Sequence, residues 1–374
     1  MAATDSKRRT VNPFLAAALA LPGILPATAL AQTVPDKGIF SLDYLDYRDW
    51  QPGGDRMSVR SPSLYVLAPF ADKWTVEGSL VYDAMSGASP LWFNTLSGAS
   101  GLGVTDYRTA GDVKVTRYFD RYSIGVGGAY SHERDYISRA GSLDARWWTA
   151  DKNTTLAFSF AGNADYIHPS ARELDNGGRD TLDFLVGITQ ALSPLDIVQS
   201  NITYSSGHGY FSDPYKPLDT RPDERRVLAW QTRYYHRFAA PDATLQLGYR
   251  YLNDSFGGDS HTFDVAWAQS LAWGVTLTPS FRYYTQAAAN FWFGPPYPQG
   301  FVQGQDFTAD TRLSAFGAMT VGLKVAKEFA DGWSVNLSAD FYRQRSGWRA
   351  FGEGSQGIDP FSARWIGAGV SKTF

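Results

Sequence analysis

Apolar and polar residues alternate through nearly the whole chain after residue 37. In WSVNLSADFY, residues 333–342, the apolar side chains fall on one face of an extended strand, and the Ser, Asn and Asp side chains fall on the other. Segments 181–189, 244–250 and 275–283 repeat the pattern. No comparable stretch shows the 3.6-residue period of an amphipathic helix. The alternation therefore predicts an all-β chain whose strands separate an apolar face from a polar one.

Sixteen alternating segments follow one another along the chain. Most are longer than the roughly 9–11 residues that a tilted strand needs to cross a bilayer. An even number of strands also brings both chain ends to the same side, as an up-and-down barrel requires. We predict strands at about 38–47, 56–69, 73–85, 106–119, 121–135, 139–150, 153–166, 180–192, 195–208, 224–238, 242–254, 260–272, 275–288, 311–329, 332–346 and 361–374.

The connections between these strands differ in length by position. Every second connection is short, such as FADK at 70–73 and FADG at 329–332. Most of the others are long, although those near 136–139 and 255–259 are short. This layout predicts a transmembrane antiparallel up-and-down β-barrel of about sixteen strands, with short periplasmic turns and long outer loops, in the bacterial outer membrane. The long loops are predicted at 86–105, 167–179, 209–223, 289–310 and 347–360.

The composition agrees with a barrel that faces lipid. The chain has 12 Trp, 21 Tyr and 23 Phe, and many of them fall on the apolar faces of the strands. A secreted β-sandwich or a soluble propeller is the alternative, but such folds present Thr, Lys and Glu to water. The chain has no Cys, which excludes disulfides and thiolate metal sites. Its net charge of −3 argues against nucleic acid as a partner.

The first 31 residues have the pattern of a secretory signal peptide. A basic segment, KRR at 7–9, precedes a short apolar stretch, and the A-x-A site at 29–31 predicts cleavage after Ala31. A membrane anchor is the alternative, but Pro22 and Pro26 interrupt the apolar stretch. We therefore expect an exported protein whose single barrel domain comprises residues 32–374.

The last ten residues, WIGAGVSKTF, resemble the C-terminal strand signal of outer-membrane proteins. Their alternation places Ile366, Ala368, Val370 and the terminal Phe374 on one face. We expect the outer-membrane assembly machinery to recognise this strand through Phe374. Lys372 departs from the usual pattern, but a lysine near the periplasmic rim can extend its ammonium group to water.

Strand parity places four carboxylates on the inner face near the outer ends of their strands. Carboxylates at a pore mouth attract cations or bind a divalent ion through oxygen ligands. The alternative is a polar lumen in which basic side chains balance the acids; Lys114, Arg146, Arg250, Arg282 and Lys324 also point inward. The four candidate residues are Asp83, Glu133, Asp135 and Asp165.

The histidines and the cofactor motifs bear on an enzymatic function. His132, His168 and His208 follow the outward-facing residues of their strands, so we expect them to meet lipopolysaccharide headgroups rather than one another. No P-loop, dinucleotide-binding glycine motif or HExxH motif is present. We therefore predict no catalytic residues and no cofactor, with an outer-membrane enzyme using residues of the rim as the alternative.

The connection YDAMSGASPLWFNTLSGASG, residues 82–101, contains the tetrapeptide SGAS twice. No helix follows to make it a phosphate-binding loop. Its small residues allow tight folding, and the apolar segment between the repeats can turn inward. We expect this outer loop to shape or partly close the entrance. The repeated residues are Ser86, Gly87, Ala88, Ser89, Ser97, Gly98, Ala99 and Ser100.

At YDAMSGASP and YSHERDYIS the sequence resembles the bacterial domain of unknown function 3570 family. The likeness lies in Asp83 with the SGAS segment, and in Glu133, Asp135 and Tyr136. The resemblance implies an exported outer-membrane barrel over essentially the whole mature chain, and it implies no reaction. Family members occur beside a small lipoprotein, a thioredoxin-like protein and a flavin transferase, which points to envelope redox-pathway proteins as partners.

The function expected from these observations is that of an outer-membrane barrel with a channel-like or porin-like role, or a component of an envelope pathway, for a small solute or a cation. Sixteen strands can enclose an aqueous channel. The alternatives are an outer-membrane enzyme and a scaffold barrel that conducts nothing. Outer-membrane lipid and lipopolysaccharide are the expected surroundings.

Overall fold

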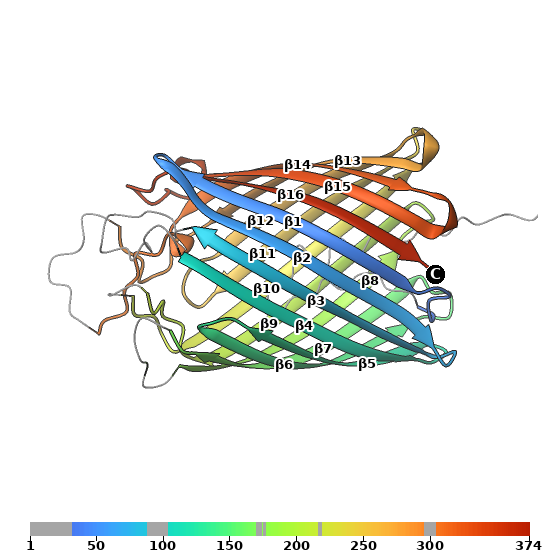
Figure 1. Cartoon of the computed structure of the whole chain (residues 1–374), viewed down its shortest axis with the longest axis horizontal. Helices are drawn as coiled ribbons and strands as arrows, with labels where there is room; N and C mark the ends of the chain where they lie inside the picture. The colour runs from blue at the N-terminus through green and yellow to red at the C-terminus, as the bar shows by residue number, and fades with distance from the viewer. Residues whose placement is uncertain (1–31, 88–103, 170–173, 175–176, 216–218, 295–303) are drawn as a thin grey trace, which may run out of the picture. The chain divides into compact units, whose positions relative to one another are not determined.

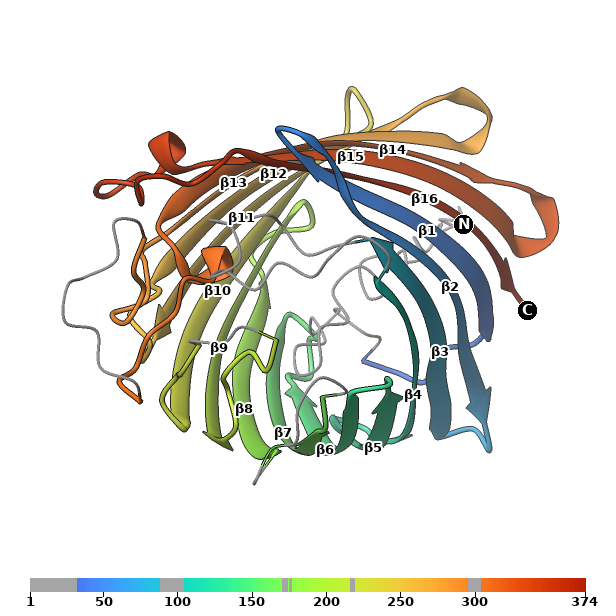
Figure 2. The same ribbon diagram turned by 60° about the vertical axis from the view of Figure 1, so that its left-hand side comes forward.

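The computed structural model describes residues 32–87, 104–169, 174, 177–215, 219–294 and 304–374, and these form a closed antiparallel barrel (Figure 1, Figure 2). Each strand pairs with its neighbours in sequence, and β1 pairs with β16 to close the wall. The strands are β1 (Ile39–Gln51), β2 (Gly54–Phe70), β3 (Trp74–Gly87), β4 (Val104–Tyr118), β5 (Tyr122–His132), β6 (Tyr136–Trp148), β7 (Thr154–Ile167), β8 (Gly178–Ala191), β9 (Asp196–Gly209), β10 (Glu224–Phe238), β11 (Ala243–Asp254), β12 (Ser260–Ser270), β13 (Val275–Gln286), β14 (Phe316–Glu328), β15 (Trp333–Arg345) and β16 (Phe361–Thr373).

The barrel confirms the predicted fold class, with sixteen strands, short turns at one end and mostly long connections at the other. The largest difference in a strand boundary concerns β14, which begins at Phe316 rather than near 311. The reason is local. Asp310 accepts a hydrogen bond from the backbone N–H of Arg312 and caps a short 3₁₀ turn, Thr311–Leu313, before the strand begins.

The wall has an apolar outer face and a polar inner face, because side chains alternate along each strand. In β1, Leu42 and Tyr44 are exposed on the outside, whereas Ser41 is buried on the inside. Fully buried side chains among the described residues are more often polar than apolar, which reverses the arrangement of a water-soluble protein. This distribution is stable where hydrocarbon surrounds the wall and every backbone group is paired within it. No helix in the described ranges is long and apolar enough to cross a membrane.

Tight turns connect the strands at the short end. Asp331 and Gly332 have φ values of 58° and 76°, and Trp273 and Gly274 have values of 61° and 71°. Two consecutive positive φ angles give the type I′ geometry that matches the twist of a hairpin. At Gly332 a Cβ atom would lie 2.6 Å from the carbonyl oxygen of Thr373, so the turn also requires the missing side chain.

The chain ends close the barrel beside these turns. The backbone N–H of Phe374 donates to the carbonyl of Gly38 at 3.0 Å, and the N–H of Gly38 donates to the carbonyl of Phe374 at 2.9 Å. The Lys372 ammonium lies 5.2 Å from the ring centre of Trp333 and donates to the carbonyl of Asp331 in the adjacent turn. Lysine is tolerated at this position because its ammonium reaches the end of the wall.

Candidate functional site at the mouth of the barrel

Asp83, the first of the predicted mouth carboxylates, is held in an ion pair on the inner wall. It is 7% exposed and lies opposite Arg108 in the register of β3 and β4. The guanidinium Nε and Nη2 atoms of Arg108 are both 2.6 Å from Oδ2 of Asp83. Asp83 therefore holds the Arg108 guanidinium against the wall, and little of its own carboxylate is exposed to water.

Glu133 and Asp135 lie in the short connection between β5 and β6, close to this pair. Burial raises the pKa of the Glu133 carboxyl above its ordinary value; Arg108 opposes the shift, and Asp106, Asp83 and Asp135 add to it. Asp135 accepts a hydrogen bond from the hydroxyl of Tyr215, which comes from the β9–β10 connection. The Arg108 guanidinium thus lies among several carboxylates at this part of the mouth.

Asp165, the fourth predicted carboxylate, belongs to a separate cluster. It is 5% exposed and accepts hydrogen bonds from Nε of Arg179 at 2.9 Å and from Nη2 at 2.6 Å. Arg179 also donates to the hydroxyl of Tyr136 at 3.1 Å, and its guanidinium carbon lies 5.3 Å from the ring centre of Phe211. The Arg179 guanidinium is thus held by the Asp165 carboxylate and by the aromatic side chains of Tyr136 and Phe211.

These contacts favour a mixed-charge mouth over a divalent-cation site. Asp83 and Asp165 are paired with different arginines, and Asp135 is bound to a tyrosine. Within the part of the chain that the structure describes, no three His, Cys, Asp or Glu side chains are grouped so that they could hold a metal ion.

The histidines are dispersed. His132 lies opposite Ile137 on the outer face, the ring of His168 stacks on Tyr166 at 5.2 Å, and His208 lies opposite Glu224. In the described ranges no two of these three histidines contact each other through any hydrogen bond or ring contact. The SGAS repeats lie outside the described residues except for Ser86 and Gly87, at the end of β3.

Two copies of the tripeptide Asp-Thr-Arg, at 219–221 and 310–312, build a polar cluster at the mouth in which both carboxylates are buried. In the first copy, Arg221 donates to both carboxylate oxygens of Asp219, at 2.7 and 3.0 Å. In the second, Nε of Arg312 is 3.0 Å from each carboxylate oxygen of Asp310. Nη2 of Arg221 then donates to Oδ2 of Asp310 at 2.9 Å and joins the two copies. We call these six residues the Asp-Thr-Arg cluster.

The backbone reinforces the Asp-Thr-Arg cluster. Thr220 and Phe307 exchange two backbone hydrogen bonds, at 2.9 and 2.8 Å, so the β9–β10 and β13–β14 connections form a short antiparallel bridge. The hydroxyl of Thr308, which has no exposed surface, donates to Asp219 at 2.5 Å. Asp310 is only 1% exposed. Two long connections from different parts of the wall are therefore fixed to each other.

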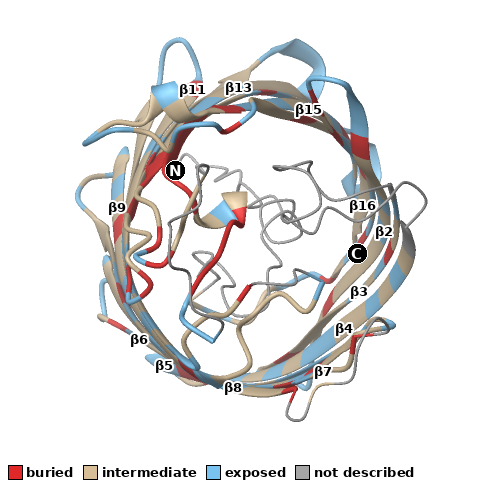
Figure 3. Cartoon of the chain, turned by 90° about the vertical axis from the view of Figure 1, so that its left-hand side faces the viewer, coloured by how far each residue is buried: buried red, intermediate tan, exposed pale blue. Residues whose placement is uncertain are grey.

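An aromatic cluster packs against residues of the same connections. Phe256 and Phe291 are 2% and 7% exposed, and their rings meet edge to face at 5.0 Å. The side-chain amide of Gln286, on the inner face of β13, donates to the carbonyls of Arg312 and Ser314 at 2.9 and 2.6 Å. Viewed along the barrel, described parts of these connections lie inside the ring of strands (Figure 3). These parts of the connections narrow the mouth of the barrel.

Below the mouth, the inner wall carries an excess of carboxylates on one side and an excess of cations on the other. On the side of β3 to β8, Glu77 pairs with Lys114 at 2.5 Å, and Asp112, Asp144 and Asp183 face the lumen from even-numbered strands. On the side of β10 to β14 the inward side chains include more cations than anions. These cations are Arg233, Arg250, Arg282 and Lys324.

The sequence places this barrel in a family. The family model described as Protein of unknown function (DUF3570) matches residues 97–175 and 168–365. The chain belongs to the DUF3570 family. Among curated proteins, none matches the chain.

Solved structures resemble the DUF3570 chain in fold. CdiB from Acinetobacter baumannii has a TM-score of 0.54 and 10% identity, over 90% of this chain and 60% of that chain. A bacterial polysaccharide outer membrane secretin has a TM-score of 0.52 and 7% identity, over 90% of this chain and 98% of that one. OccK9 (OpdG) from Pseudomonas aeruginosa has a TM-score of 0.45 and 10% identity, over 90% and 98%. For the two structures with TM-scores above 0.5, the similarity at these identities is one of fold.

The raised pKa of Glu133 gives the DUF3570 chain a testable pH response. Because its pKa is raised, Glu133 loses its charge at a higher pH than an ordinary glutamate does as the pH falls. We expect the cation preference of the barrel to decline through that pH range, and Glu133→Gln to remove this step. Reversal potentials in a salt gradient measure it. Glu224→Gln, at a side chain that is 64% exposed on the outer face, should leave the step intact; a step that persists in Glu133→Gln would refute the assignment.

Proposed function

We propose that this protein is a channel of the bacterial outer membrane for small polar solutes and ions, exported behind a cleaved signal peptide. The observation that carries the proposal is the closed wall whose inner face bears ionised side chains while its outer face is apolar. Charged side chains directed into a lumen require water there, since desolvating them without compensation is costly. Barrels of 16–18 strands leave room for an aqueous channel.

The distribution of charge suggests which solutes pass. A lumen with an excess of carboxylates on one side and an excess of guanidinium and ammonium groups on the other orients dipolar and zwitterionic molecules. It excludes apolar ones, since an apolar solute gains nothing from such walls. The mouth adds several carboxylates around Arg108, which favours cations over anions. Small hydrophilic or zwitterionic solutes are therefore the proposed cargo.

Liposome swelling tests the proposal. Proteoliposomes diluted into isosmotic arabinose, glycine or a large oligosaccharide swell only if the solute enters. We expect swelling with arabinose and glycine and none with the oligosaccharide. Absence of swelling with every solute would favour the non-conducting barrel, because the Asp-Thr-Arg cluster would then seal the mouth.

A further inference from the structure

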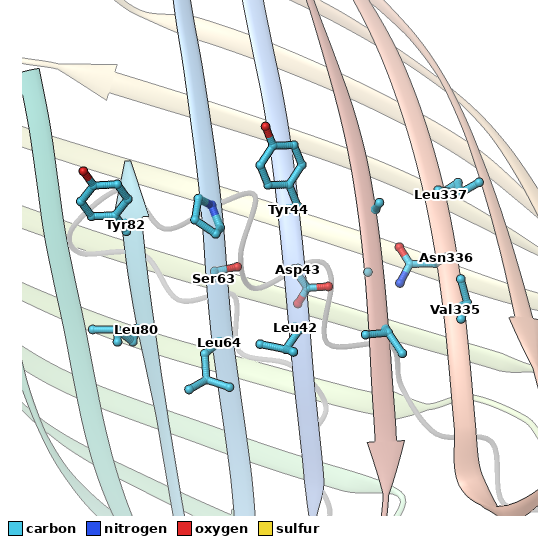
Figure 4. A pocket seen from close by; sticks show the side chains of 14 residues that line it. Leu42, Asp43, Tyr44, Ser63, Leu64, Leu80, Tyr82, Val335, Asn336 and Leu337 are labelled. Atoms are coloured by element: carbon cyan, nitrogen blue, oxygen red, sulfur yellow. The ribbon is translucent and has the colours of Figure 1, made fainter. Parts of the chain in front are cut away.

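A groove on the outer face of the wall crosses the seam where the barrel closes. It has a volume of about 580 Å³ and spans β15, β16, β1, β2 and β3. One row of its floor runs through Leu80, Leu64 and Leu42, which are successive cross-strand partners (Figure 4). A second row runs from Pro62 through Tyr44 to Ala368 and Leu337.

The groove owes its depth to two small side chains. Ala368 lies between Tyr44 and Leu337, and Pro62 lies beside Tyr44. Tyr44 and Leu337 are 43% and 58% exposed, so they rise on either side of Ala368. The volume is in the range of about 300–1,000 Å³ that ligand sites occupy, and the lining is almost wholly apolar. Hydrocarbon chains fit such a surface.

Arginine side chains project from the same outer face on the side of the long loops. Arg48 is four residues beyond Tyr44 on β1, and Arg364 is four residues before Ala368 on β16, so each is about 13 Å along its strand from the groove. Arg60 on β2 and Arg343 on β15 extend the row on either side. We call these four residues the outer arginine row.

The arginines of the outer arginine row lie close enough to one another to favour the binding of an anion. Arg48 and Arg364 are direct partners in the register of β1 and β16. Like charges in such positions repel each other and destabilise a sheet. Asp46 lies 3.3 Å from Nε of Arg48. No other ion pair to the row is formed within the described ranges, so the patch stays positive.

We propose that this groove and the outer arginine row together form a binding site for a phosphate-bearing lipid of the surrounding leaflet. The arginines bind the phosphate groups, for which guanidinium provides paired N–H donors. The acyl chains run down the strands into the groove. In the outer leaflet of a bacterial outer membrane, the lipid of this chemistry is the phosphorylated glycolipid lipid A. The site depends on membrane insertion and is independent of conduction.

The binding test compares three probes on the purified full chain in zwitterionic micelles: bisphosphorylated lipid A, the same lipid after enzymatic dephosphorylation, and inorganic phosphate. We expect lipid A to bind at least tenfold more tightly than its dephosphorylated form, and inorganic phosphate not to displace it. Equal affinity for the two lipid forms would overturn the role of the arginines. Displacement by inorganic phosphate alone would overturn the role of the groove.

Variants locate the site. Arg48→Gln with Arg364→Gln should reduce lipid A affinity to that of the dephosphorylated lipid, whereas Arg139→Gln, at an exposed outward arginine on β6, should not change it. Ala368→Phe should weaken the binding of both lipid forms. The proposal is wrong if the double variant binds lipid A like the wild type, or if Arg139→Gln loses as much affinity.

Thermal unfolding without lipid separates binding from a folding defect. Because the double variant relieves a repulsion, its unfolding temperature in lipid-free micelles should equal or exceed that of the wild type. Addition of lipid A should then raise the unfolding temperature of the wild type and not that of the variant. An equal rise in both would overturn the site. Conductance should be unchanged in the variant, so loss of the lipid site and loss of the channel are distinguishable.

Discussion

Asp310→Ala should increase the single-channel conductance several-fold. Asp310 is the carboxylate that both Arg221 and Arg312 bind, and its side chain is 2% exposed. Its removal takes away the carboxylate that joins the two Asp-Thr-Arg copies, and leaves Arg221 with Asp219 and Arg312 with Asp213 as separate pairs. We expect the β13–β14 connection to separate from the β9–β10 connection and leave the mouth wider. Current recordings at fixed voltage measure the change.

The matched control is Asp306→Ala. Asp306 is exposed and lies in the same connection, four residues before Asp310. Its substitution should leave the conductance at the wild-type value. Hydrogen exchange at the backbone amides of Phe307 and Thr220 reports whether the bridge between these two residues has opened. Open amides together with an unchanged conductance would show that these connections do not limit the current.

Arg250→Glu should shift the selectivity of the lumen strongly toward cations. Arg250 faces inward from β11 and donates to the hydroxyl of Thr262 at 3.5 Å. Reversal of its charge removes a cation from the positive side of the wall and adds an anion, so the electrostatic barrier to cations falls. We expect the cation-to-anion permeability ratio to rise several-fold at low salt, and to rise less at high salt because of screening.

Two further variants test whether the shift in selectivity comes from the charge at position 250 rather than from a folding defect. Arg250→Gln neutralises the side chain and should give about half the shift in reversal potential. Arg226→Glu places the same new charge on the outer face of β10, at a side chain that is 63% exposed, and should give no shift. A shift of equal size in Arg226→Glu would mean that the ions do not sense the inner wall.

The strands of this barrel could be predicted from the sequence because their determinants are local. Alternation fixes which side chains of a strand share a face, and the length of each connection indicates on which side of the membrane it lies. The inward positions of Asp83 and Asp165 follow from parity alone. The partners of these residues do not, since Arg108 is brought to Asp83 by the pairing register of β3 and β4.

The loop cluster and the outer groove depend on contacts between distant parts of the chain. The two Asp-Thr-Arg copies are visible as a repeat in the sequence, but each copy alone is typical of a surface turn. Only the fold brings Arg221 to Asp310. The groove requires closure of the barrel, since Tyr44 and Ala368 lie near opposite ends of the chain and meet only where β1 pairs with β16.

Conductance of the purified wild-type chain in a planar bilayer decides whether the barrel is a channel. We predict discrete, stepwise currents that are ohmic at low voltage and prefer cations at neutral pH, because the lumen is polar and several carboxylates surround Arg108 at the mouth. A correctly folded and inserted protein that gives no steps above the leak of the lipid, both as the wild type and as Asp310→Ala, would contradict the channel and leave a sealed barrel.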